Sequence, residues 1–154
     1  MKNIGFFILL ITLSIFTACK KEKDYVIFHT FKDQTWARFN ILQFEIPVES
    51  QQMTCDVSFF IHLTRDYEYD YLDFNMIMTT PSGEERIKEY HMNIKGKEGN
   101  FLGQWSQDSC ELSIPLKKKI LLTKGMLILQ IENLVPRPLT KGLKGVGIRL
   151  HPVG

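Results

Sequence analysis

From Tyr25 onward, the chain alternates apolar and polar residues with a period of two, in short runs separated by turn-forming residues. This alternation indicates β-strands with one buried face, because successive strand side chains point to opposite sides of a sheet. Leu42, Phe44, Ile46 and Val48, for example, share one face of a predicted strand. Helical periodicity is almost absent from this part of the chain, so we expect an all-β fold.

About nine strands are predicted from this pattern. Their ranges are 25–31, 39–48, 55–63, 72–80, 87–94, 110–115, 120–122, 126–134 and 145–151. Pro81 and Gly83 suit a tight turn, and Pro115 is expected to end its strand because proline has no backbone N–H. Two packed antiparallel sheets, a jelly-roll-like β-sandwich, would bury so many one-sided strands. The segments expected to be irregular are 34–38, 64–71, 95–109 and 135–144.

The first 18 residues have a different composition. Residues 4–18 are uncharged and follow Lys2, and they are fewer than the roughly 20 apolar residues that a membrane-spanning helix needs. A positive start and a short apolar run describe a secretory signal peptide. Residues 16–19, FTAC, resemble the bacterial lipobox, in which the cysteine is lipidated after cleavage, although Phe16 stands where Leu is usual. We expect a lipoprotein signal peptide over 1–18 and lipid attachment at Cys19; an unmodified signal peptide and a spanning anchor are the alternatives.

The remaining chain is organised simply. Residues 19–24 are polar enough for a lipidated tether, and residues 25–154 show no repeat and no second linker, so we expect one β-sandwich domain. The sequence contains 19 Lys and Arg against 17 Asp and Glu, and the segment 1–18 removes one lysine. Its one basic cluster, at 117–119, is too small for nucleic-acid binding, which needs a concentrated basic surface.

Two cysteines, Cys55 and Cys110, remain after the expected cleavage. Each shares its parity with the apolar residues of its strand, so both side chains should point into the core. An exported protein can form disulfides. The two thiols therefore either pair or stay apart as small buried hydrophobic side chains, and the sequence leaves both alternatives open.

Catalysis requires convergent nucleophiles, acids, bases or metal ligands. The chain has no GxSxG elbow, no phosphate-binding glycine loop and no pair of histidines at zinc-site spacing. Each histidine stands alone in a different predicted strand: His29, His62, His91 and His151. His62 and His91 lie on the polar parity and should face solvent. We therefore expect no enzymatic activity, no cofactor and no metal.

The most distinctive loop spans 66–73, DYEYDYLD, where four carboxylates and three tyrosines alternate. Clustered oxygen ligands are typical of calcium sites, although the EF-hand order is missing. The alternatives are sugar binding by Tyr67, Tyr69 and Tyr71, contact with a protein partner, and a plain connecting loop. Trp36 and Trp105 are expected to pack on the core. The proline- and glycine-rich segment 135–144 either orders a rim surface or merely connects two strands.

Several segments occur together in a characteristic order: a lipobox, an aromatic run over 25–36, FEIPV at 44–48, RDYEYDYL at 65–72, TTPSG at 79–83, GNFLGQW at 99–105, IPLKK at 114–118 and GVGIRL at 145–150. This collinear set resembles the GldH family of gliding-motility lipoproteins over nearly the whole chain. The resemblance implies a non-enzymatic envelope lipoprotein of Gram-negative bacteria.

It further implies an interaction subunit of motility or linked secretion machinery, held at a membrane through Cys19 and in contact with other cell-envelope proteins. The outer membrane is the expected location, with its periplasmic and surface faces both open. The alternative function is a surface-tethered glycan-binding β-sandwich module, suggested by Trp105 and by the loop 66–73, which we call the tyrosine loop.

Overall fold

The computed structural model describes residues 23–153. Within this range the chain forms nine β-strands, one short 3-10 helix and no α-helix, which confirms the predicted all-β class. The elements are β1 Tyr25–Thr30, η1 Lys32–Gln34, β2 Thr35–Ala37, β3 Leu42–Leu63, β4 Tyr71–Thr79, β5 Glu85–Asn93, β6 Gln104–Ser106, β7 Ser109–Asn133, β8 Leu139–Lys141 and β9 Leu143–Pro152. The predicted signal peptide, Cys19 and most of the predicted tether lie outside the described residues.

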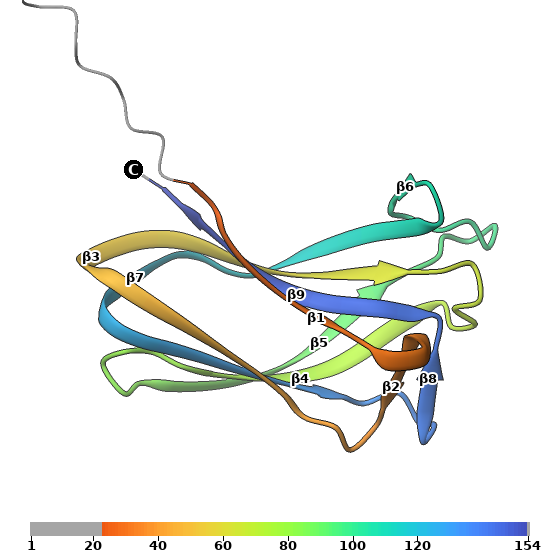
Figure 1. The fold of residues 1–154 in the computed structure, drawn as a ribbon, viewed down its shortest axis with the longest axis horizontal. Helices are drawn as coiled ribbons and strands as arrows, with labels where there is room; N and C mark the ends of the chain where they lie inside the picture. Colours follow the sequence, from red (N-terminus) through yellow and green to blue (C-terminus); the bar gives the residue numbers. More distant parts are fainter. Residues whose placement is uncertain (1–22, 154) are drawn as a thin grey trace, which may run out of the picture.

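The two longest strands build the sandwich. β3 and β7 pair antiparallel along almost their whole length and fold back together at one end, so each contributes to both layers (Figure 1). One layer contains β1, β9, the second half of β3, the first half of β7, and β6. The other contains the first half of β3, the second half of β7, β4 and β5. β2 and β8 form a separate two-stranded sheet.

The structure has two long strands where the sequence predicted five shorter ones. The predicted strands 39–48 and 55–63 are joined in one 22-residue strand, β3, which begins at Leu42. The predicted strands 110–115, 120–122 and 126–134 are joined in the 25-residue β7, which ends at Asn133. Between the predicted strands 39–48 and 55–63, the alternation stops because most side chains at the bend are exposed. The backbone of β3 nevertheless pairs again with β7 after a shift of register between Val48 and Gln52. Such shifts bend a strand without ending it.

The expectation that Pro115 ends its strand is wrong. Pro115 lies inside β7, opposite Ser58 of β3. Among the described residues, β7 has no partner on its other side between Glu111 and Ile128. Proline is tolerated beside a free strand edge because no ladder hydrogen bond is lost there. The short strands β2, β6 and β8 lie in segments that were expected to be irregular.

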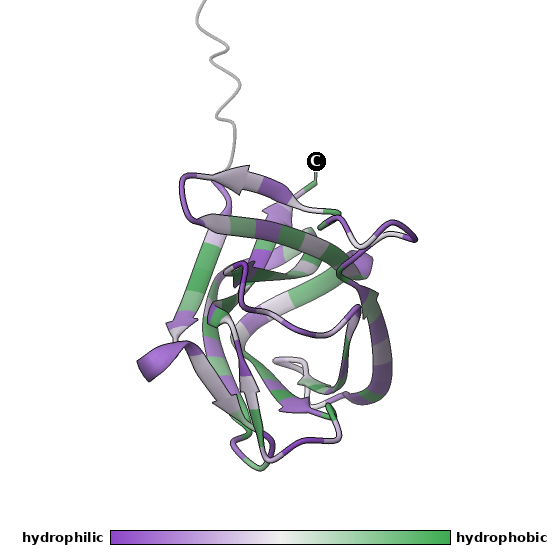
Figure 2. Cartoon of the chain, turned by 90° about the vertical axis from the view of Figure 1, so that its right-hand side faces the viewer, coloured by the Kyte–Doolittle hydropathy of each residue, from purple (hydrophilic) through white to green (hydrophobic). Residues whose placement is uncertain are grey.

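The core lies between the two layers and is apolar. Green and purple positions alternate along the strands in Figure 2, as expected for strands with one buried face. Phe59 of β3 meets Phe74 of β4 across the interior, with 4.4 Å between ring centroids. Tyr90 of β5 stacks on Phe74 and donates its hydroxyl hydrogen to the carbonyl of Leu116 at 2.8 Å, which ties β5 to β7.

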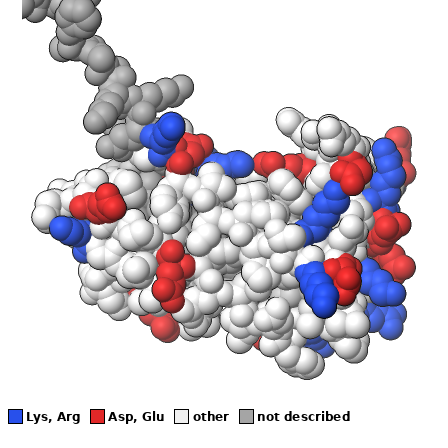
Figure 3. All heavy atoms as spheres, in the orientation of Figure 1, with Lys and Arg blue, Asp and Glu red and all other residues white. Residues whose placement is uncertain are grey.

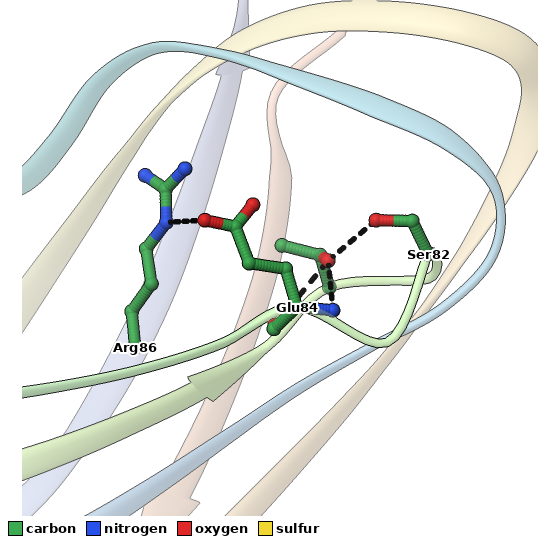
Figure 4. Close-up of polar contacts among 4 residues, drawn as sticks. Ser82, Glu84 and Arg86 are labelled. Carbon is green, nitrogen blue, oxygen red and sulfur yellow. Dashed lines mark hydrogen bonds and ion pairs between the residues drawn. The ribbon is translucent and has the colours of Figure 1, made fainter.

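The predicted tight turn connects β4 and β5 (Figure 4). Gly83 adopts a φ of +86°, and its N–H donates to the carbonyl of Thr80. The Thr80 hydroxyl accepts the N–H of Glu84 at 3.1 Å and lies 2.9 Å from the Ser82 hydroxyl. Arg86 donates to the Glu84 carboxylate at 2.7 Å, and this hydrogen bond lowers the pKa of Glu84.

The sandwich has two distinct ends. The near end comprises the common bend of β3 and β7 and the start of β1, where the chain continues toward Cys19 (Figure 1). The far end carries β2, β6, β8 and the loops around them. The described residues include no helix that is long and apolar enough to cross a membrane.

Candidate functional site

Two loops that the sequence singled out meet at the far end. The N–H of Thr64, two residues before the loop 66–73, donates to the carbonyl of Gly142 at 2.9 Å, which joins the start of this loop to the segment 135–144. Gly142 has a φ of +79°, and a Cβ there would lie 2.4 Å from the backbone nitrogen of Tyr67. Only glycine satisfies both the backbone conformation and this close approach.

A buried polar network fixes the second loop. The Asn133 side-chain amide donates to the Thr140 hydroxyl at 2.9 Å, and its oxygen accepts the N–H of Val135 at 2.9 Å. Asn133 and Thr140 are both fully buried. Buried polar groups with satisfied hydrogen bonds hold one conformation, so segment 135–144 forms an ordered rim.

The three tyrosines of the first loop have separate roles. Tyr67 is buried, donates its hydroxyl hydrogen to the carbonyl of Tyr71 at 2.8 Å, and has its pKa raised by that burial. Tyr69 contacts Tyr67 edge to face and is half-buried. Tyr71 is exposed and packs beside His91. They form no common platform on which a sugar ring could stack, so the sugar-binding interpretation loses its main support.

The loop also fails to gather metal ligands. Between residues 23 and 153, no group of three or more histidine, cysteine or acidic side chains is placed to hold a metal ion. The histidines are dispersed as the sequence indicated. His62 lies 3.2 Å from Glu111, His91 lies 2.6 Å from Asp73, and these two pairs are on different strands.

Both tryptophans pack as expected. Trp36 is fully buried, stacks on Phe31 and donates its indole N–H to the carbonyl of Asn40 at 2.9 Å. Trp105 is half-buried beside a groove of about 610 Å³. The Arg65 guanidinium lies over its ring at 4.3 Å, and Phe101 meets it edge to face. One face of Trp105 is therefore covered by the protein itself.

The two cysteines are free and buried. Cys55 lies opposite Ile120, whereas Cys110 lies opposite Leu63, eight residues farther along β3. Eight strand residues span about 26 Å, and a disulfide requires Cα atoms within roughly 7 Å. The paired alternative for Cys55 and Cys110 is therefore contradicted, and both act as small core side chains.

Burial disfavours the thiolate form of both cysteines. It raises the pKa of Cys55 to about 11 from 9.0, and it also raises the pKa of Cys110. At pH 8 the thiolate fraction of Cys55 should be about a hundredfold smaller than for an unshifted thiol. We expect iodoacetamide to leave both thiols unmodified in the folded protein and to modify both after denaturation without reductant, as read by peptide mass spectrometry. A peptide pair joined through Cys55 and Cys110 would contradict this result.

An apolar surface at the far end was not foreseen. Phe39, in the loop between β2 and β3, is 85% exposed, the highest value for any large apolar side chain in the described chain. Leu139 of β8 is 54% exposed and pairs with Ala37 of β2. The N–H of Arg38 donates to the carbonyl of Pro138 at 3.0 Å, so the backbone of the turn that carries Phe39 is held against the start of β8.

We call this surface the far-end patch and define it as Phe39, Pro138, Leu139, Arg38 and Arg137. It continues into a hollow of about 420 Å³ that is also lined by Glu68, Tyr69 and Lys141. Charged side chains of both signs gather at the same end, as Figure 3 shows. Aromatic and arginine side chains within a mixed polar rim are typical of protein interfaces.

One signal in the sequence could have revealed half of this patch. Phe39 and Ile41 share the parity of Gln43 and Glu45, which is opposite to that of Leu42. They therefore belonged to the outward face of the predicted strand. The other half depends on the pairing of β2 with β8, which are about 100 residues apart in sequence.

Comparison with known proteins adds an independent observation. The family described as GldH lipoprotein matches residues 24–150. No curated protein matches. Among solved structures, dimeric latent PorU from Porphyromonas gingivalis is 8% identical with a TM-score of 0.38, and the match covers 82% of this chain and 12% of that one.

The VP2 subviral particle of infectious bursal disease virus is 12% identical with a TM-score of 0.32. That match covers 85% of this chain and 34% of VP2. The chain thus spans only a small part of both solved structures. Scores this low carry no argument about shared fold or function.

The strand order, the two layers and the loop-built far end define a small all-β sandwich protein. The family match spans far more than half of the sequence. The chain belongs to the GldH lipoprotein family, and it is therefore a gliding-motility-associated lipoprotein. Membership implies that it is anchored to a membrane through lipid.

A pair of glycines tests the contact between the two far-end loops. Gly142 and Gly99 have nearly equal φ values, +79° and +78°, but a Cβ at Gly99 would meet nothing within 4 Å. Gly99→Ala should cost about 1–2 kcal/mol from the left-handed backbone alone. Gly142→Ala should cost clearly more, since the new methyl group also displaces the backbone of Tyr67. Urea unfolding of both variants measures the difference, and equal costs would show that the contact is unimportant.

Proposed function

We propose that Cys19 carries the lipid and that the anchored protein binds another cell-envelope protein through the far-end patch. The lipobox-like FTAC segment supports Cys19, and membership of a lipoprotein family supports an acylated cysteine. The proposed location is the outer membrane. The proposed partner belongs to the motility machinery or to the secretion machinery linked to it.

The exposure of Phe39 and Leu139, which the pairing of β2 with β8 brings to one end of the sandwich, carries this proposal. Phe39 is 85% exposed although the Arg38 guanidinium lies beside its ring. Burial at an interface would remove apolar surface from water, which stabilises a complex by roughly 25 cal/mol per Å² before the costs of association. β2 and β8, which carry most of the patch, lie at the end opposite the start of β1 (Figure 1). We therefore expect an anchor at Cys19 to leave the patch open to a protein partner.

The arginines suggest the character of the partner. Arg38 lies beside the ring of Phe39, with its guanidinium carbon 5.9 Å from the ring centroid. Arg137 and Lys141 line the adjoining hollow together with Glu68. A partner that offers an apolar side chain bordered by carboxylates would complement this surface, because charge complementarity directs encounter and excludes wrong partners.

A double substitution tests the patch separately from the anchor. Phe39→Ser with Leu139→Ser should leave membrane fractionation and thermal unfolding unchanged, because both side chains are exposed. It should reduce gliding on a surface and the recovery of secreted proteins to the level of a deletion strain. Val26→Ser is the matched control, since Val26 is 49% exposed on β1 outside the patch. Normal gliding and secretion in the double variant would refute a docking role for the patch.

A further inference from the structure

The near end carries a surface that the far-end patch does not explain. We call it the near-end tip and define it as residues 117–126 of β7. Its four lysines are Lys117, Lys118, Lys119 and Lys124, and all are exposed. Leu121 and Met126, also in the tip, are 59% and 42% exposed. Basic and apolar side chains thus occur together on one projecting bend.

The tip lies close to the point where the chain continues toward Cys19. Asp24, just before β1, contacts His151 of β9. The next residue of β9, Pro152, pairs with Cys55, and Cys55 pairs with Ile120 of the tip. The start of the described chain and the tip therefore lie at the same level of the sandwich, three strand spacings or about 14 Å apart.

The lysines of the tip are available for an external partner. Within residues 23–153, none of the four forms a salt bridge. Asp56 is close to the tip, but its carboxylate accepts the backbone N–H of Lys119 at 2.7 Å. Glu84 is engaged by Arg86. Besides the hydrogen bond from Arg86, the charge of Lys117 contributes to the lowered pKa of Glu84, but none of the four ammonium groups lies within 4.0 Å of a carboxylate oxygen of the described residues.

We propose that the near-end tip rests on the lipid surface, with Leu121 and Met126 in the interfacial layer and the lysines on anionic headgroups. Interfacial binding combines buried apolar area with attraction of Lys to anionic lipid. Long lysine stems lie along apolar surface while their charges reach the headgroups. The tip would hold the sandwich in one orientation, because it adds a second contact with the bilayer to the single anchor at Cys19.

The short distance along the chain between Cys19 and the sandwich supports the lipid surface as the partner of the tip. The proposal rests on the lipid anchor at Cys19, which is four residues before Lys23. Four residues span at most about 14 Å when fully extended. The near end therefore stays next to the bilayer whenever the anchor is inserted, and the tip lies on that end.

Site-directed spin labelling tests the proposal on the full lipidated protein. A nitroxide at Leu121→Cys is compared with one at Leu102→Cys, which is 53% exposed at the far end, in vesicles of phosphatidylcholine and phosphatidylglycerol. The native Cys55 and Cys110 are buried and should not be labelled. On vesicle binding, the label at 121 should lose access to a water-soluble nickel chelate and gain access to oxygen, whereas the label at 102 should keep its nickel access.

Two further measurements separate the parts of the proposal. Vesicle flotation reports the anchor independently of the labels, so a failed anchor is distinguished from a tip that does not touch lipid. Lys117→Ser, Lys118→Ser and Lys124→Ser together should restore nickel access at 121 while flotation is kept. Floated protein with equal nickel access at 121 and 102 would overturn the proposal, and an unchanged label environment in the triple variant would overturn the role of the lysines.

Discussion

Replacement of Cys19 by Ser is expected to move the protein almost completely from the membrane fraction to the soluble fraction. A diacylglyceryl group and an N-acyl chain on Cys19 would supply the anchor, because each buried methylene contributes about 0.8 kcal/mol and one chain alone holds only marginally. Serine offers no thiol for acylation. The near-end tip alone should not hold the protein through washing at high salt, since screening weakens its attraction to lipid.

Fractionation with immunoblotting measures this change, and Lys20→Ser, one residue away, is the control that should stay with the membrane. The Cys19→Ser variant should unfold at the wild-type urea concentration, because Cys19 precedes the first strand, which begins at Tyr25. Its motility function should be lost with the anchor. A variant that fractionates and functions like the wild type would contradict the proposed role of Cys19.

Phe59→Ala is expected to lower the free energy of unfolding by about 3–5 kcal/mol. Phe59 is fully buried on β3 and meets Phe74 of the opposite layer at 4.4 Å. Its loss would leave a cavity between the layers, because β3 and β4 are held in place by their own ladders and cannot collapse to fill it. Urea unfolding of the soluble Cys19→Ser protein measures the cost.

Ile87→Ala is the control for this substitution. Ile87 is 67% exposed on β5, so its truncation should change the free energy of unfolding by less than about 0.5 kcal/mol. A cost below about 1 kcal/mol for Phe59→Ala would mean that the two layers are not packed as described. The slope of the unfolding free energy with urea should remain unchanged in both variants.

Local patterning predicts the strands well but not their continuity. The alternation of Leu42, Phe44, Ile46 and Val48 reports burial on one face, and each of these residues is buried as expected. The bend at 49–54 carries mostly exposed side chains that resemble a turn, although backbone pairing with β7 resumes there. The alternation of apolar and polar residues reports which side chains are buried, whereas strand pairing depends on backbone atoms. A prediction from alternation therefore divides β3 and β7 into shorter strands.

The far end was the least predictable region because long-range pairing builds it. The tyrosine loop was conspicuous in sequence, yet Tyr67 belongs to the core. Parity placed Phe39 on the outward face of the predicted strand, but its position in a turn against the start of β8 depends on the pairing of β2 with β8. The inward direction of Cys55 and Cys110 was predicted from parity and is confirmed. The distance between the two cysteines depends on the register in which β3 and β7 pair, and the parity of single residues does not predict that register.

Site-specific photo-crosslinking in intact cells tests most directly whether the anchored protein docks through its far end. A photoreactive amino acid at position 39 is compared with one at position 26 on β1, and captured proteins are identified by mass spectrometry. We predict that position 39 captures a defined motility or secretion protein, that position 26 does not, and that Leu139→Ser reduces the capture. Capture of only abundant envelope proteins, to the same extent from both positions, would contradict a docking function for the far-end patch.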